Sequence, residues 1–246
     1  MIPAPTPTPT PTPTRPWRLG LSRPGLIGGV VYLVLGVLWL GLARPRGPVE
    51  VYAIWLAALV LVGLLLPGIA NQVTLARAYL AAPALAYATS PDSFGLLAIT
   101  VALAGLTDLA DGTIARRFDR PTQFGGALDP VVDGVYFGAV AFGLAAGGAY
   151  PTWLAAVVIV RYALPAAVGT FLLASGRPPQ LRHTLLGQVS TTLIAVLLGG
   201  IALFRGLGQD SHAIVVGAEV VIPLSALAAF GHLFWVNRGS MAGSPG

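Results

Sequence analysis

The sequence predicts an all-α fold, a polytopic bundle of transmembrane helices, and three observations lead to this prediction. Of the 246 residues, 55% are hydrophobic and 9% are charged, whereas a soluble domain carries roughly 25% charged residues. The mean hydropathy is +0.79. The apolar residues form eight long segments, and a helix needs about 20 residues to cross a bilayer. Continuous segments of this length exclude barrel strands, in which apolar and polar residues alternate.

The eight expected helices are separated by short connections rich in proline, glycine and arginine, such as residues 44–48, and these residue types end helices. Ahead of the first helix, residues 1–24 alternate proline and threonine over much of their length. This composition predicts a disordered or polyproline-like tail. Residues 238–246 are expected to form a second, flexible tail. The expected helices span residues 25–43, 50–66, 71–90, 93–118, 123–147, 151–175, 183–205 and 212–236.

The distribution of charge argues against nucleic acid as a partner and predicts an orientation. All fourteen basic residues are arginine, and they lie at the ends of apolar segments rather than in one stripe. If the end that carries Asp108 faces the cytoplasm, nine arginines lie on that side and three on the other, as the positive-inside rule requires. We therefore expect an integral protein of the plasma (inner) membrane with its site facing the cytoplasm.

The absence of cysteine excludes disulfides and thiolate metal sites.

Four aspartates stand out because an ionised carboxylate in apolar sequence is costly without a cation partner. Asp108 and Asp111 are three residues apart on one expected helix, and Asp129 and Asp133 are four apart on the next. Both spacings place a pair on one helix face. A short polar turn joins the helices, so the four carboxylates are expected to converge near the cytoplasmic surface. Oxygen ligands of this kind suit Mg²⁺, Mn²⁺ or Ca²⁺, and four charges balance two divalent ions.

Small residues and an arginine follow the first aspartate pair. Gly112 and Ala115 leave room for a ligand near the backbone, and Arg116 offers a forked donor to phosphate oxygens. This order favours a metal and phosphate site over an ion pathway. The alternative is that the carboxylates form structural salt bridges with arginines, which would explain one pair more readily than four.

The stretch from Asp108 to Asp133 resembles the signature of the CDP-alcohol phosphotransferases (CDP-alcohol phosphatidyltransferases), D-x-x-D-G-x-x-A-R-(x)8-G-x-x-x-D-x-x-x-D. Upstream, residues 67–77 resemble the family's P-N-x-x-T-x-x-R pattern, except that three residues separate Pro67 from Asn71. The resemblance covers residues 67–237 and implies a six-helix core, which leaves residues 25–66 as two additional transmembrane helices. The residues that match the signature are Asp108, Asp111, Gly112, Ala115, Arg116, Gly125, Asp129 and Asp133.

The resemblance also implies roles for residues. Asp108, Asp111, Asp129 and Asp133 would be metal ligands for two divalent cations, Mg²⁺ or Mn²⁺. Asp133 would in addition be the catalytic base that takes the proton from the acceptor hydroxyl. The CDP-binding residues would be Asn71, Thr74, Asp111, Gly112, Ala115 and Arg116. The two additional helices would serve lateral packing or dimer contact, and a homodimer is left open.

The expected activity is transfer of a phosphatidyl group from CDP-diacylglycerol in the membrane to a polar alcohol, with release of CMP. An intramembrane arginine usually faces a cavity or a carboxylate. Arg161 in the segment 151–175, with Arg177 and Arg182 in the following loop, is therefore a candidate for binding an acceptor phosphate. The alternatives are ordinary positive-inside charge for Arg177 and Arg182, and pairing with a site aspartate for Arg161.

Three rival functions follow from the same residues. A transferase that uses a soluble CDP-alcohol and a lipid acceptor would have the same site. A divalent-cation carrier would use the aspartates for transport, although Arg116 would repel its cargo. A scaffold without activity fits poorly with four acidic residues at these spacings.

Overall fold

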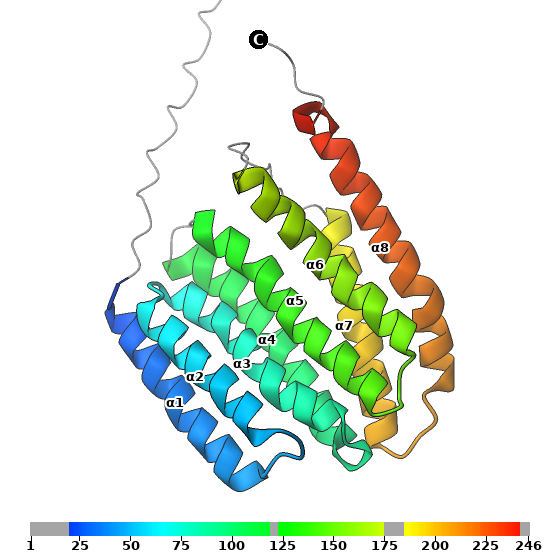
Figure 1. Ribbon diagram of the computed structural model, residues 1–246, viewed down its shortest axis with the longest axis horizontal. Helices are drawn as coiled ribbons and strands as arrows, with labels where there is room; N and C mark the ends of the chain where they lie inside the picture. The colour runs from blue at the N-terminus through cyan, green and yellow to red at the C-terminus, as the bar shows by residue number, and fades with distance from the viewer. Residues whose placement is uncertain (1–19, 119–122, 175–184, 242–246) are drawn as a thin grey trace, which may run out of the picture.

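The computed structural model describes residues 20–118, 123–174 and 185–241; within these ranges the side chains of residues 111–127, 166, 168–174, 185, 233–234 and 236–241 lie outside this description. Within these ranges the protein is a bundle of eight α-helices, with one short 3-10 helix at Pro91–Ser93 (Figure 1). The predicted all-α class is therefore confirmed. The helices are α1 (Arg23–Ala43), α2 (Val49–Leu65), α3 (Ile69–Ala88), α4 (Phe94–Phe118), α5 (Gln123–Ala146), α6 (Thr152–Ala174), α7 (Leu185–Gly206) and α8 (His212–Met241).

Local sequence explains where the first helices begin and end. The Ser22 side chain caps α1 by accepting a hydrogen bond from the Gly25 amide at 3.1 Å, which satisfies one of the unpaired donors of the first turn. After α2 the chain turns within Leu66, Pro67 and Gly68. Gly68 has a φ of 94°, a conformation that glycine adopts without steric cost. This tight turn starts α3 two residues before the predicted position and holds α2 and α3 together.

Five helical stretches of the described residues are long and apolar enough to cross a membrane: Arg23–Ala43, Pro91–Ala110, Leu128–Ala146, Leu186–Gly206 and His212–His232. Val49–Leu65 and Thr152–Pro165 are shorter apolar helices. Large apolar side chains of α1, α4, α7 and α8 point outward, as in Leu38, Ile99 and Val196, where lipid replaces water as the solvent. The protein is therefore an integral membrane protein.

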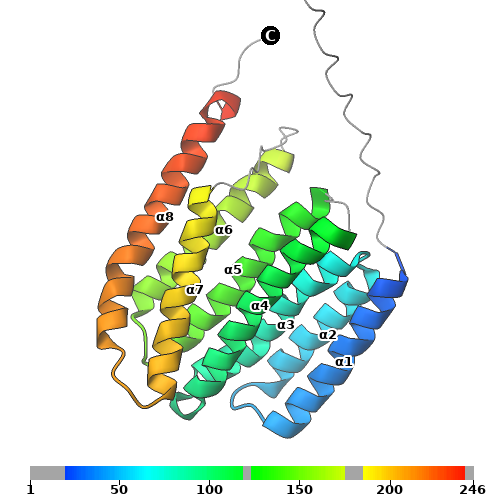
Figure 2. The ribbon, with the colours of Figure 1, turned by 180° about the vertical axis from the view of Figure 1, so that it is seen from behind.

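Helix α3 lies inside the bundle, in contact with α1, α2, α4 and α5. Figure 1 shows α1 and α2 along one side of the molecule and α8 along the opposite side, with α3, α4 and α5 between them. Seen from behind, α7 lies beside α4 and α8 (Figure 2). One apolar core joins α3 to α4, α5, α6, α7 and α8, and a second joins it to α1 and α2. Side chains on two faces of α3 therefore link the N-terminal hairpin, meaning α1 and α2, to the rest of the bundle.

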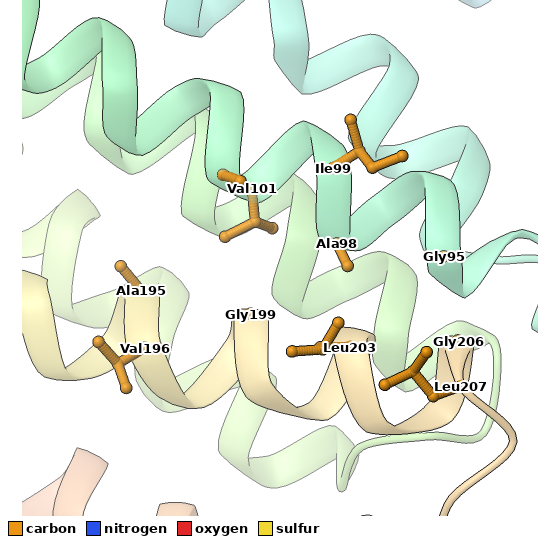
Figure 3. A pocket seen from close by; sticks show the side chains of 11 residues that line it. Gly95, Ala98, Ile99, Val101, Ala195, Val196, Gly199, Leu203, Gly206 and Leu207 are labelled. Atoms are coloured by element: carbon orange, nitrogen blue, oxygen red, sulfur yellow. The ribbon is translucent and has the colours of Figure 1, made fainter.

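Helices α4 and α7 meet at glycines. A Cβ atom on Gly206 would lie 2.7 Å from the Gly95 Cα, and one on Gly199 would lie 3.0 Å from the Val101 Cγ1. Small residues allow helix backbones this close in lipid. An apolar groove of about 520 Å³ runs along this contact, between Ala98 and Leu203 among other residues (Figure 3). Its lining residues on α4 belong to the first turns of that helix, away from Asp108, so the groove holds none of the predicted site residues.

Candidate active site

One side of α3 carries Asn71 and Thr74, which the sequence analysis selected, together with Arg77, which it did not. Asn71, Thr74 and Arg77 follow one another at intervals of three, which places them along one side of a helix. The Asn71 amide donates to the Pro67 carbonyl at 2.7 Å, and the Thr74 hydroxyl donates to the Ala70 carbonyl at 3.2 Å. Both predicted nucleotide-binding side chains thus lie in the first turns of α3 and satisfy backbone carbonyls there.

Arg77 connects three helices. Its guanidinium reaches from α3 to α4, where Nη2 lies 2.9 Å from Asp108 Oδ1. It also reaches α5, where Nη1 donates to Asp133 Oδ1. The Arg77 side chain is only 3% exposed, and a buried guanidinium is stable only when carboxylates or other acceptors compensate its charge. The cation partner of Asp108 and Asp133 in this structure is therefore an arginine.

The third described aspartate lies beside this contact. Asp129 is half-buried one turn before Asp133 on α5, and both Asp108 and Asp129 act electrostatically on the Asp133 carboxylate. The carboxylates of α4 and α5 thus face one another across Arg77. The Asp111 side chain, one turn beyond Asp108, lies outside the described residues.

The acidic side chains fit a hard divalent cation by their chemistry, since they offer carboxylate oxygens alone. Among the side chains that the structure describes, however, no group of three or more potential ligands lies close enough to hold a metal ion. The predicted set of four carboxylate ligands includes Asp111, whose side chain is not described. Arg77 lies between the Asp108 and Asp133 carboxylates and contacts both. The two-cation site accordingly stays a prediction.

Several predicted site residues fall outside the description. Gly112, Ala115 and Arg116 belong to α4, but their side chains are not described, and Arg177 and Arg182 lie in the undescribed residues 175–184. Their predicted roles in binding CDP and an acceptor phosphate stay predictions.

Arg161 is buried on α6, with 8% of the residue exposed. Its Nε donates to the Ser190 hydroxyl and its Nη2 to the Gly187 carbonyl, both at 3.4 Å. Ser190 in turn donates to the Ser225 hydroxyl at 3.1 Å. This chain of hydrogen bonds links α6, α7 and α8. Arg161 thus bonds to α7, and the Asp133 carboxylate of α5 lies near enough to act electrostatically on its guanidinium.

Sequence reasoning gave no role to Arg77, although the signal was present. An arginine within an apolar helix usually faces a carboxylate. Arg77 also shares its face of α3 with Asn71 and Thr74, and four aspartates follow on the next two helices. The choice of its partners depends on how α3 packs against α4 and α5, which spacing within one helix does not reveal.

The fold and the site define a class: polytopic membrane proteins with an acidic site between neighbouring helices. The sequence model of the CDP-alcohol phosphatidyltransferase family matches residues 68–229, which run from the start of α3 into α8 and leave α1 and α2 outside. The chain belongs to the CDP-alcohol phosphatidyltransferase family.

Curated relatives agree with this assignment. A probable cardiolipin synthase (CMP-forming) of Drosophila melanogaster is 31% identical over 53% of this chain and 45% of its own length. A cardiolipin synthase (CMP-forming) of Streptomyces coelicolor is 33% identical over 41% of this chain and 46% of its own. A CDP-diacylglycerol–glycerol-3-phosphate 3-phosphatidyltransferase of Yersinia enterocolitica is 30% identical over 56% of this chain and 74% of its own. The chain thus spans about half the length of the two cardiolipin synthases.

Proposed function

We propose that this protein transfers a phosphatidyl group from CDP-diacylglycerol to the hydroxyl group of a polar alcohol and releases CMP. The observation that carries the proposal is the contact of Asp108 and Asp133 with one buried arginine, inside the region that matches the family. The names of the relatives support it, because one names CDP-diacylglycerol as a substrate and two name CMP as a product.

The reaction divides between binding and proton transfer. Asp108, Asp111, Asp129 and Asp133 would hold two divalent cations, Mg²⁺ or Mn²⁺, which neutralise charge at a pyrophosphate and at the phosphorus under attack. Around them, Asn71 and Thr74 would bind the CDP group together with Gly112, Ala115 and Arg116.

Proton transfer would fall to Asp133. Arg77 holds this carboxylate towards α4, where Asp133 would accept the proton of the acceptor hydroxyl. The hydroxyl oxygen then forms a bond to the phosphorus that carries diacylglycerol. The bond from that phosphorus to the bridging oxygen breaks, and the electron pair leaves with CMP. The protein mainly positions groups and compensates charge, which suits phosphoryl chemistry.

The acceptor is proposed to carry a phosphate, as glycerol 3-phosphate does in the name of the Yersinia relative. Both hydrogen bonds of Arg161 measure 3.4 Å, which is long for a guanidinium donor. A phosphate oxygen would therefore be a better acceptor for Arg161 than its present partners, and Arg177 and Arg182 would add charge at the same membrane surface. The distribution of arginines supports a site that faces the cytoplasm from the plasma membrane.

The test uses the purified full chain in lipid nanodiscs with CDP-diacylglycerol, Mg²⁺ or Mn²⁺, and either glycerol 3-phosphate or glycerol. CMP release that requires the acceptor, is faster with the phosphorylated alcohol and stops with EDTA is the expected result. Absence of CMP release with a panel of polar alcohols overturns the proposal. Turnover of a soluble CDP-alcohol with diacylglycerol would identify the alternative transferase. Uptake of Mn²⁺ into liposomes without CDP-lipid would identify a cation carrier.

A further inference from the structure

We propose that the N-terminal hairpin, which lies outside the region matched by the family, positions the nucleotide-binding end of α3 and does so through Gln72. The inference rests on the proposed function for its kinetic test, because Asn71 and Thr74 are the residues that Gln72 would position. It assigns a role in substrate binding to two helices that otherwise look like added membrane spans.

The side chain of Gln72 completes the end of α2. Its amide nitrogen donates to the Gly63 carbonyl at 2.8 Å and to the Leu66 carbonyl at 2.7 Å. Carbonyls in the last turn of a helix lack their regular helical partner. The Gly63 carbonyl also accepts from the Leu66 amide at 3.3 Å, so the glutamine of the next helix adds a second donor to Gly63 and supplies a donor to Leu66. Gln72 is 8% exposed, so water cannot easily replace these bonds.

Helix α1 contacts the same residue from another direction. The Tyr32 hydroxyl donates to the Gln72 main-chain carbonyl, and its ring stacks on Tyr79 of α3 with centroids 5.6 Å apart. Gly28 lies one turn earlier on α1, and a Cβ atom there would be 2.1 Å from the Gln72 Oε1. The glycine therefore leaves the space that the amide occupies, and the two hydrogen bonds to α2 keep the amide from moving away.

These contacts lie at the level of the candidate site. Gln72 directly follows Asn71 and precedes Thr74 by two residues, and a helix transmits a shift at one residue to its neighbours. The N-terminal hairpin contacts one side of α3 while Asn71, Thr74 and Arg77 occupy another. At the far end of α3, Trp39 of α1 donates to the Tyr87 hydroxyl at 2.8 Å. That bond lies about 22 Å along the helix from Gln72, at 1.5 Å per residue.

The experiment compares hydrogen-bond deletions at the two ends of α3 in the full chain. Gln72→Met keeps the length of the side chain and removes both donors, and Tyr32→Phe removes one hydroxyl while keeping the stacked ring. Trp39→Phe is the matched control, since it removes one hydrogen bond between α1 and α3 far from the site. We expect Gln72→Met and Tyr32→Phe to raise KM for CDP-diacylglycerol about tenfold, because each removes one or two buried hydrogen bonds that position the binding residues. Their kcat should stay within about twofold, and Trp39→Phe should leave KM unchanged.

A second measurement does not depend on the proposed reaction. Hydrogen–deuterium exchange of residues 66–76, followed by mass spectrometry, should quicken in Gln72→Met and Tyr32→Phe and stay at the wild-type rate in Trp39→Phe. If this pattern appears in a protein that releases no CMP, the positioning role stands and the proposed function fails. If CMP is released but all three variants keep the wild-type KM and exchange rates, the positioning role is wrong.

Should Gln72→Met fail to fold, Gly28→Ala perturbs the same amide by adding one methyl group. Its control is Gly36→Ala on the same helix, where the added Cβ would meet the Leu56 Cδ1 at an ordinary 3.5 Å. Gly28→Ala should raise KM for CDP-diacylglycerol and speed the exchange of residues 66–76, whereas Gly36→Ala should change neither. Equal behaviour of the two alanine variants overturns the inference.

Discussion

Two arginine–aspartate contacts lie at opposite ends of the bundle, and their atoms are almost equally close. Arg77 Nη2 lies 2.9 Å from Asp108 at the candidate site, and Arg46 Nη1 lies 3.2 Å from Asp92 between two connections at the far end. The difference is burial of the arginine: the Arg77 side chain is 3% exposed although its partner Asp108 is 64% exposed, whereas the side chains of Arg46 and Asp92 are both exposed, at 70% and 82%.

Distance alone therefore does not show which contact matters. Water and ions screen the outer pair, and such pairs contribute about 0–1 kcal/mol. Arg77 has exchanged water for carboxylates, so loss of the carboxylates leaves its guanidinium uncompensated in a poorly hydrated place, and loss of Arg77 does the same to Asp133, which is 17% exposed. An arginine and an aspartate join two connections at the far end of the bundle. At the candidate site, Arg77 holds the carboxylates of Asp108 and Asp133 in place.

The largest effect is expected for Asp133→Asn. The amide keeps the shape of the side chain but cannot take a proton from the acceptor, and general base catalysis contributes about 10²–10⁴-fold in rate. CMP release should therefore fall by about that factor, while the variant stays in the membrane and still binds CDP. Asp92→Asn is the control and should keep its activity. Near-normal turnover of Asp133→Asn would show that another group is the base.

Arg77→Met should be the most destabilising of these changes. The variant removes the guanidinium and leaves Asp133, which is 17% exposed, without its partner. Breaking a buried ion pair in this way costs about 3–5 kcal/mol. Thermal unfolding in detergent, measured without divalent cation, should show a markedly lower midpoint. Added Mn²⁺ should restore part of the loss if the carboxylates bind it, because a ligand of the folded state stabilises it. An unchanged midpoint would contradict the buried bridge.

A smaller and more selective effect is expected for Arg161→Ala. Loss of a charged hydrogen-bond donor weakens binding by about 1.5–3 kcal/mol, so KM for a phosphorylated acceptor should rise at least about tenfold. KM for CDP-diacylglycerol should change little. The matched control is Arg205→Ala, since Arg205 also bonds a serine, Ser211, at 2.9 Å but lies in the last turn of α7. Equal increases in both KM values would show that Arg161 acts on packing rather than on the acceptor.

The smallest effect is expected for Arg46→Met. Because both side chains of this pair are exposed, the unfolding midpoint and CMP release should stay close to wild type, with a stability change below about 1 kcal/mol. High salt should reduce even this difference, since ions screen exposed charges. If Arg46→Met lowered the unfolding midpoint as much as Arg77→Met, burial would not explain the difference between the two ion pairs.

Much of the fold was predictable because lipid imposes strong rules on sequence. Long apolar segments must be helical, and the described helices begin and end within two residues of the predicted segments, with one exception. Helix α8 continues to Met241, five residues beyond its predicted end, so the first residues of the predicted C-terminal tail are helical. Glycines and prolines mark the turns, as Gly68 does between α2 and α3. Helix α3 begins two residues before the predicted position, because the turn is complete at Gly68 and both Ile69 and Ala70 join the helix.

The candidate site was predictable only in part. The spacing of Asp108 and Asp133 indicated acidic faces on two neighbouring helices, because periodicity within one helix fixes which residues share a side. The link between these aspartates through Arg77 was not predictable in the same way, since it depends on the rotation and depth of α3 against α4 and α5. The contacts of Gln72 with Tyr32 and Gly63 depend equally on how the N-terminal hairpin packs.

The sequence by itself determined a helical membrane protein with four acidic residues at helical spacings. These properties follow from composition and periodicity, which act within single segments. The tertiary structure alone decided that Asp108 and Asp133 meet one arginine and that Gln72 ties three helices together. Such contacts join residues far apart in the chain, and only side-chain packing between helices selects them.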